Sequence, residues 1–178
     1  MDIRFNPERS VHWIGDVNDR NLARVTKTMT TLFANDAASP IFLLLKTDGG
    51  DMAAGFTFYD FVRRFKPPLV SVAIGEVASM GVVLFVSAEH RAALMRATFY
   101  LHEPHITVEE ASVAEMNEEM KELKKDRARF IRTISAGTNR KTSRSKIERL
   151  IQNETTLTAE EAARIGLVHH IWKPSAIR

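Results

Sequence analysis

The pattern of apolar and polar residues along the chain predicts strands that alternate with helices. Unbroken apolar runs at 41–45 and 69–74 have the character of central strands that are covered on both faces. Apolar residues at helical spacing in 21–34 and 56–65 predict amphipathic helices before and after the first of these runs. Since the connections are short, we expect parallel strands, right-handed crossovers and an α/β fold.

The remaining elements are shorter, apart from one long helix. Strands are predicted at 11–14, 92–95, 98–101 and 167–172, helices at 82–88, 142–152 and 158–166, and a loop at 153–156. Thr158 and Glu161 form a capping box at the start of the last helix. No linker, internal repeat or low-complexity tract separates these elements, so residues 1–178 are expected to form a single domain.

The long helix is expected at about 108–135, starting after Thr107, which forms a capping box with Glu110, and ending at Gly137. Its apolar positions are three and four residues apart, at Val113, Met116, Met120, Leu123, Phe130 and Ile134. Arg127 occupies the one position of this alternation that is not apolar. So narrow a seam favours contact with another helix over burial against a sheet.

The composition narrows the classes of protein to consider. Of the 178 residues, 44% are hydrophobic and 26% are charged, as is usual for a soluble globular protein. Cysteine is absent, which excludes disulfides, thiolate metal sites and a cysteine nucleophile. The N-terminal residues lack the pattern of a secretory signal, so a cytoplasmic location is expected. Residues 69–88 are long enough to cross a bilayer, but Glu76 within them favours a strand and a helix inside a globular core.

The net charge of +3 is unevenly distributed. Residues 103–119 contain six acidic side chains and no Lys or Arg, whereas residues 121–149 contain eleven basic and three acidic side chains. A nucleic-acid patch is one interpretation, but the basic run has neither regularly interleaved aromatic residues nor a known binding motif. We therefore favour a structural role. Acids at the start of a helix and bases at its end complement the helix dipole, and they also complement a second, antiparallel copy.

Residues 75–81, Gly-Glu-Val-Ala-Ser-Met-Gly, lie between a predicted strand and a predicted helix. Ser79 is therefore expected on the turn, at the start of a helix whose first backbone N–H groups have no partner. A strand-turn-helix of this kind can expose a nucleophilic serine. The alternative is that these small residues only let a helix pack closely against a strand.

A serine nucleophile needs a base and donors for the oxyanion, and the chain has a candidate for each. His102 follows a predicted strand, and His105 in the next loop remains a second candidate for the base. The Gly49-Gly50 pair follows the strand at 41–45, where glycine lets backbone N–H groups approach a ligand closely. The N–H of Met80 would be the other donor. Taken alone, a histidine or a glycine pair has a structural role more often than a catalytic one.

Several short motifs occur in a fixed order between the predicted elements. They are Asp48-Gly49-Gly50, Phe65-Lys66-Pro67, Gly75-x-x-Ala78-Ser79-Met80-Gly81, His102-x-Pro104 and Gly166-Leu167-Val168. With the long helix after His102, they make the chain, from about residue 10 to residue 172, resemble the proteolytic subunit of Clp protease. The resemblance implies a crotonase-like α/β spiral with a protruding handle helix and an ATP-independent peptide-cleaving site. It also implies rings of seven subunits that stack, through the handle helix, into a barrel.

The resemblance assigns Ser79 as nucleophile and His102 as general base, with the N–H groups of Gly50 and Met80 binding the oxyanion. It needs no metal or organic cofactor. The family's third catalytic residue is an aspartate, and alignment on Gly166-Leu167-Val168 puts Glu154 at that position. A Ser-His-Glu triad is chemically sound because glutamate can orient the imidazole as aspartate does. Asn153 is the alternative, and as a neutral side chain it would stabilise the imidazolium less.

Two further departures from the family pattern bear on substrates and partners. Asp48 stands where the family usually has proline, and its charge could lower activity or select basic substrate residues. The chain also begins almost at its first strand, where family members carry a segment that engages a partner ATPase, so docking of an unfoldase is left open. Two other functions remain: a crotonase-type acyl-CoA hydratase or isomerase, and a catalytically weak or inactive ring subunit.

Overall fold

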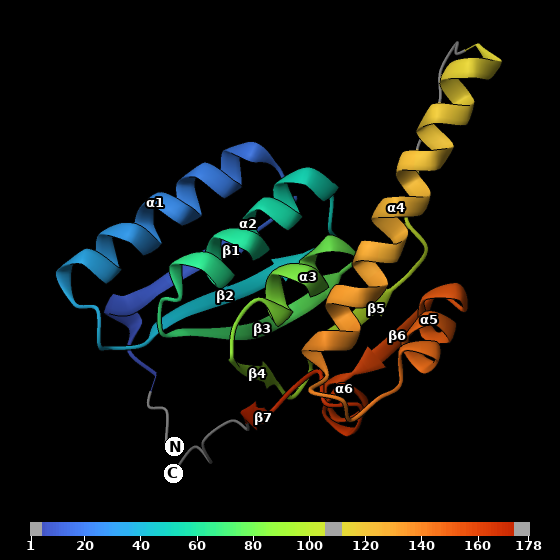
Figure 1. The fold of residues 1–178 in the computed structure, drawn as a ribbon. Helices are drawn as coiled ribbons and strands as arrows, with labels where there is room; N and C mark the ends of the chain where they lie inside the picture. The colour runs from blue at the N-terminus through green and yellow to red at the C-terminus, as the bar shows by residue number, and fades with distance from the viewer. Residues whose placement is uncertain (1–4, 106–111, 173–178) are drawn as a thin grey trace.

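The computed structural model describes residues 5–105 and 112–172, which form a mixed α/β fold around one sheet (Figure 1). The strands are β1 (Ser10–Ile14), β2 (Ile41–Thr47), β3 (Leu69–Ala78), β4 (His90–Leu94), β5 (Thr98–Leu101), β6 (Thr155–Thr158) and β7 (His170–Trp172). β1, β2, β3, β4 and β7 are neighbours in that order and pair in parallel. The predicted parallel α/β arrangement is therefore confirmed.

β3 organises the sheet because it is long enough to pair with two strands along one edge. Residues 70–73 pair with β4, and residues 76–78 pair in parallel with β5. β5 in turn pairs antiparallel with β6, with Leu101 opposite Thr155. The prediction of a loop at 153–156 was wrong in its second half. The four residues of β6 carry too short a pattern to recognise, and their strand conformation depends on hydrogen bonds to β5.

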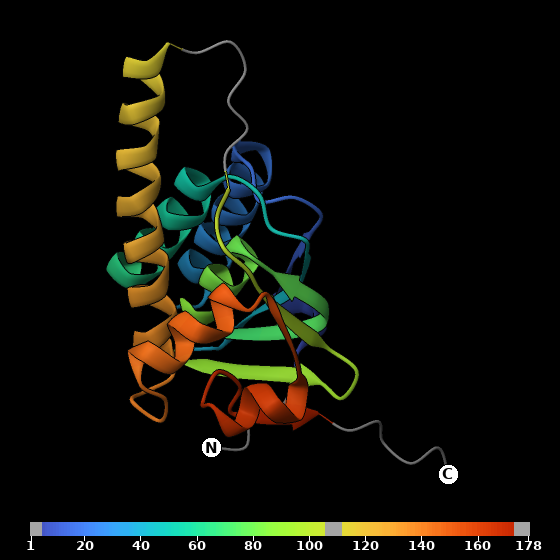
Figure 2. The same cartoon turned by 90° about the vertical axis from the view of Figure 1, so that its right-hand side faces the viewer.

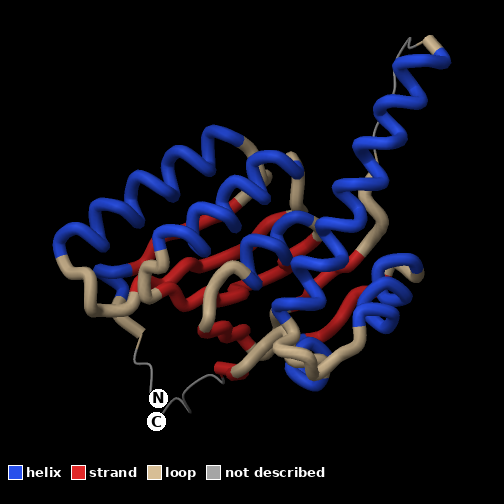
Figure 3. The backbone as a smooth tube through the Cα atoms, in the orientation of Figure 1, coloured by secondary structure: helices blue, strands red, loops and turns tan. Residues whose placement is uncertain are grey.

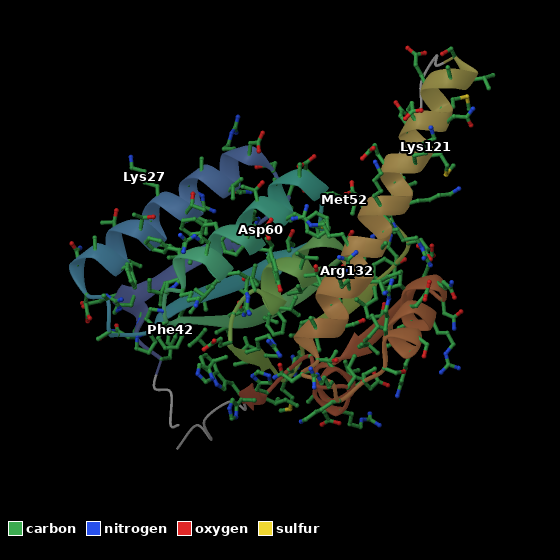
Figure 4. The ribbon with its side chains drawn as sticks, in the orientation of Figure 1. Lys27, Phe42, Met52, Asp60, Lys121 and Arg132 are labelled. Carbon is green, nitrogen blue, oxygen red and sulfur yellow. The ribbon has the colours of Figure 1, made fainter. Side chains whose placement is uncertain are left out.

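The helices are α1 (Asp19–Asn35), α2 (Met52–Phe65), α3 (Met80–Val86), α4 (Val113–Gly137), α5 (Arg144–Gln152) and α6 (Ala159–Arg164), with a short 3₁₀ turn at Pro7–Arg9. α1, α2 and α3 cover one face of the sheet (Figure 3). The core lies between these helices and the sheet, and all seven residues of α3 are buried. Trp13 of β1 meets Phe58 of α2 edge to face, with ring centroids 5.2 Å apart. Phe42, labelled in Figure 4, belongs to a smaller apolar cluster with Val70, Val72 and Ala92.

α4 projects well beyond the sheet, as the two views show (Figures 1 and 2). It begins at Val113 because Ser112 and Glu115 close a capping box, so its start was predicted too early. The predicted box of Thr107 and Glu110 lies outside the described residues. Within the described ranges, neither α4 nor any other helix is long and apolar enough to cross a membrane.

The two halves of α4 have different surroundings. Phe130, Ile131 and Ile134 are buried against the body of the protein. In the projecting half, which carries Lys121 in Figure 4, the apolar seam is bare: Val113, Met116 and Met120 are 76%, 49% and 47% exposed.

A buried arginine ties the end of α4 to the sheet. Arg91 of β4 is only 3% exposed. Its guanidinium donates to the carbonyl oxygens of Ala88, Gly137, Gly166 and Leu167. It also donates to His169 Nε2 at 2.7 Å, so this nitrogen must be unprotonated. Burial, and then the charge of Arg91, lower the pKa of His169 to about 4.

This contact predicts how folding stability depends on pH. The folded pKa of His169, about 4, lies below the ordinary value of 6.5, so the unfolded chain binds more protons between these values. The contribution of His169 is therefore complete above pH 6.5 and is lost as the pH falls toward 4. We expect thermal unfolding followed by circular dichroism to show a smaller decrease in Tm over this range for His169→Gln, which keeps an acceptor for Arg91. His12→Gln, at an exposed site on β1, is the control. Equal slopes for wild type and His169→Gln would contradict the assignment.

Candidate active site

Ser79 lies on a strained turn between β3 and α3. Its backbone dihedrals are φ 52° and ψ −125°, a conformation that residues other than glycine rarely adopt. The surrounding structure holds it there: the Ser79 N–H donates to the Tyr100 carbonyl oxygen of β5 at 2.9 Å. Strained serines on strand-turn-helix units are typical of exposed nucleophiles, and this geometry agrees with the turn predicted from residues 75–81.

Glycines allow the turn that follows β2 to touch the Ser79 turn. A Cβ built on Gly49 would lie 2.5 Å from Ser79 Cβ and 3.2 Å from Ser79 Oγ, so a side chain does not fit there. A Cβ on Gly81 would collide with the side chain of Thr47. Of the predicted glycine pair, Gly49 is therefore in contact with Ser79, whereas Gly50 packs against the backbone of Val17.

The two predicted oxyanion donors have free N–H groups among the described residues. Val17 binds both neighbours of Gly50, since its N–H donates to the Gly49 carbonyl oxygen at 2.7 Å and its carbonyl accepts from Asp51 N–H at 2.8 Å. The N–H of Gly50 therefore points away from Val17, and no described residue accepts it. Met80 is the first residue of α3, where backbone N–H groups have no partner within the helix. Both groups are available to an anion.

His102 follows the last residue of β5, close to the Ser79 turn. Its ring stacks on the ring of Tyr100, with centroids 5.0 Å apart and planes inclined by 12°. The ring of His105, the other candidate for the base, lies 5.7 Å from that of His102. Sequence reasoning missed Tyr100, whose ring limits how the imidazole can turn.

Glu154 reaches the same edge of the sheet by the pairing of β5 with β6. Leu101 is opposite Thr155. Because the two strands are antiparallel, His102 after β5 and Glu154 before β6 leave the ladder side by side. The pKa of the Tyr100 phenol is raised, first by its burial and then by the neighbouring carboxylate of Glu154. Asn153, the alternative third residue, ends α5 as its C-terminal cap and is exposed.

The hydrogen bonds that a Ser-His-Glu triad would need are not formed in this structure. Neither Ser79 with His102 nor His102 with Glu154 makes a hydrogen bond within the described residues, although strand pairing brings the three segments to one edge. Such bonds are often long without substrate and shorten when it binds. The described ranges also contain no group of three or more His, Asp or Glu side chains arranged to hold a metal ion.

An acidic groove, which sequence reasoning also missed, lies beside Gly50. It encloses about 630 Å³ between the start of α2, where Met52 is labelled in Figure 4, and the projecting half of α4. The carboxylates that line it belong to Asp51, Glu118, Glu119, Glu122 and Asp126. Of these residues only Glu118 and Glu119 belong to the acidic run at 103–119, and only the fold places α4 opposite α2.

Comparison with known proteins identifies the family of the chain. The sequence model of the family described as Clp protease matches residues 3–175. A curated relative from Treponema denticola, ATP-dependent Clp protease proteolytic subunit 2, is 25% identical over 172 residues, which are 96% of this chain and 84% of that protein. Because the family model spans nearly the whole chain, the protein belongs to the Clp protease family.

Proposed function

We propose that this protein is a serine endopeptidase that cleaves peptides or unfolded proteins inside a ring-shaped assembly. The observation that carries the proposal is the Ser79 turn, where a strained serine begins a helix and touches Gly49. Membership of the Clp protease family supports the same reaction. The family assignment also favours a peptidase over an acyl-CoA hydratase or isomerase of the crotonase type.

In the proposed mechanism, Ser79 Oγ attacks the carbonyl carbon of the peptide while His102 accepts its proton. The N–H groups of Gly50 and Met80 stabilise the oxyanion of the tetrahedral intermediate. His102 then protonates the leaving amine, and a water molecule hydrolyses the acyl-enzyme by the same steps. Glu154 holds the imidazole in the tautomer that accepts the serine proton.

Substrate binding must complete this arrangement, because the imidazole lies against Tyr100 and Glu154 acts on the Tyr100 phenol. A substrate strand beside Gly50 would also face the acidic groove. Together with exposed Asp48, the groove supports a preference for basic side chains in the substrate.

A non-catalytic ring subunit is the second candidate. The observation that favours it is that the proposed triad is not hydrogen-bonded: the Glu154 carboxylate lies beside the Tyr100 phenol and makes no hydrogen bond to His102. In that case the protein would keep the fold and the assembly without hydrolysis.

We further propose a homo-oligomeric ring, heptameric as in the family, with two rings meeting through α4. Support comes from the exposed apolar seam of the projecting helix and from its charges, which are mainly acidic in its first turns and mainly basic after Lys121. ATP hydrolysis would belong to a separate unfoldase. The cytoplasm is the proposed location because a chain without cysteine suits a reducing compartment.

The first test is covalent labelling with a fluorophosphonate probe. We expect the wild type to be labelled at Ser79, and Ser79→Ala not at all. His102→Ala should react at least about 10³-fold more slowly than the wild type, and Glu154→Gln about 10²-fold more slowly, since both substitutions remove activation of the serine. Mass spectrometry of the labelled peptide gives the site, and the time course gives the rate.

His105→Ala is the matched control, because it removes the other candidate base, and it should react at the wild-type rate. A correctly folded wild type that the probe does not label would favour the non-catalytic subunit. Slow labelling of His105→Ala together with normal labelling of His102→Ala would make His105, and not His102, the general base.

The second test concerns the contact between the glycine turn and Ser79. Gly49→Ala should lower both Tm and the labelling rate, because the new methyl group would lie only 2.5 Å from Ser79 Cβ and would displace the serine. Gly15→Ala is the matched control: Gly15 also has a positive φ, 91°, but its added Cβ would meet nothing within 4 Å. Gly15→Ala should lower the free energy of unfolding only by the strain of a non-glycine residue at positive φ, about 1–2 kcal/mol, and should leave the labelling rate unchanged. Equal effects of the two substitutions would argue against the contact.

The third test concerns the pairing of rings. Reversing Glu118 and Glu119 to lysine should halve the particle mass in mass photometry, because it removes the charge complementarity between antiparallel copies of α4. Glu115 is left unchanged because it closes the capping box. A variant with Glu8→Lys and Glu160→Lys, which changes the net charge equally, should keep the wild-type mass. If the first variant also keeps it, α4 does not pair in this way.

A further inference from the structure

Arg127 of α4 is bound by carboxylates from two other parts of the chain. Its Nε and Nη2 donate to the two carboxylate oxygens of Glu103 at 2.7 Å each, and its Nη1 donates to Glu148 Oε1 at 3.0 Å. The side chains of Arg127, Glu103 and Glu148 are 29%, 32% and 37% exposed. A bidentate pair fixes direction as well as distance, which a single hydrogen bond does not.

Each of these carboxylates is close along the chain to a member of the proposed triad. Glu103 is the residue after His102. Glu148 lies on α5, which ends at Gln152 and leads directly to Glu154. One guanidinium therefore ties the segment of the base and the helix before the acid to the same point of α4.

The position of Arg127 in the helix indicates that it does more than stabilise the fold. It interrupts an otherwise apolar seam, between Leu123 and Phe130. Replacing a partly buried ion pair by an apolar side chain of similar volume is often neutral or stabilising. Packing alone would thus be served as well by an apolar residue, whereas the guanidinium of Arg127 binds Glu103 with two donors and Glu148 with a third.

We propose that Arg127 is a positioning residue, which sets the placement of His102 through Glu103 and that of Glu154 through Glu148. The inference rests on the proposed function and deepens it. Two acids meet one base in this cluster, so removing Arg127 leaves two half-buried carboxylates that repel each other. The segments of His102 and Glu154 would then separate, and displacements of about 1 Å at a catalytic group can cost about 10²-fold in rate.

The test compares Arg127→Met with Arg127→Lys and with a matched control, Arg129→Met. Arg129 also lies on α4 and also forms an ion pair, with Asp60 at 2.6 Å, while its guanidinium covers the ring of Phe56. Two quantities are measured: kcat and KM on a fluorogenic peptide, and hydrogen–deuterium exchange of the amides at 101–105 and 152–155.

For Arg127→Met we expect kcat to fall about 10- to 100-fold with KM within about twofold, and exchange in both segments to become about tenfold faster. Arg127→Lys keeps the positive charge but cannot form the bidentate pair with Glu103. Its kcat and its exchange rates should lie between those of Arg127→Met and the wild type. Arg129→Met should match the wild type. Adding Glu103→Gln to Arg127→Met should cost little more, since both changes break the same contact.

Unchanged kcat and exchange in Arg127→Met, or equal losses in Arg129→Met, would overturn the proposal. If the wild type has no peptidase activity, the proposed function fails, yet the exchange measurement still decides whether Arg127 holds the two segments. Should Arg127→Met not fold, Arg127→Lys and Glu103→Gln provide the same comparison.

Discussion

The contact between the Gly49–Gly50 turn and the Ser79 turn is the steric constraint on which the candidate site depends. β2 and β3 are parallel neighbours, so the turns that follow them leave the sheet at the same edge. A Cβ on Gly49 would lie 2.5 Å from Ser79 Cβ, which only glycine avoids. The N–H groups of Gly50 and Met80, which no described residue accepts, belong to these two turns. The proposed nucleophile and the proposed donors are thus positioned by backbone geometry.

The length of β3 brings the other members of the site to this edge. Its first half pairs with β4 and its second half with β5, so β5 ends beside the Ser79 turn. β6 then pairs antiparallel with β5, which carries Glu154 to His102. Tyr100 contacts both residues, since its ring stacks on the imidazole and its phenol lies beside the carboxylate.

α4 connects this site with the outer part of the molecule. Its second half is anchored in the core by Phe130 and Ile134, and its first half presents the bare seam and the acidic groove. Arg127 lies at the boundary between the halves and binds Glu103, next to the proposed base, and Glu148 on α5, the helix that precedes the proposed acid.

Periodicity alone predicted the parallel α/β fold, because runs such as 41–45 and 69–74 bury both faces of a strand whatever their neighbours are. It also predicted the Ser79 turn and the nearby glycine pair, since turns of this kind have local signals; the catalytic roles of Ser79, His102 and Glu154 remain predictions. The start of α4 was predicted too early because several residues before Val113 also fit a helix start, and Ser112 is the cap that forms. β6, the stacking of Tyr100 on His102 and the binding of Arg127 by two acids could not be predicted. Each depends on contacts between residues far apart in the sequence, which only the tertiary structure brings together.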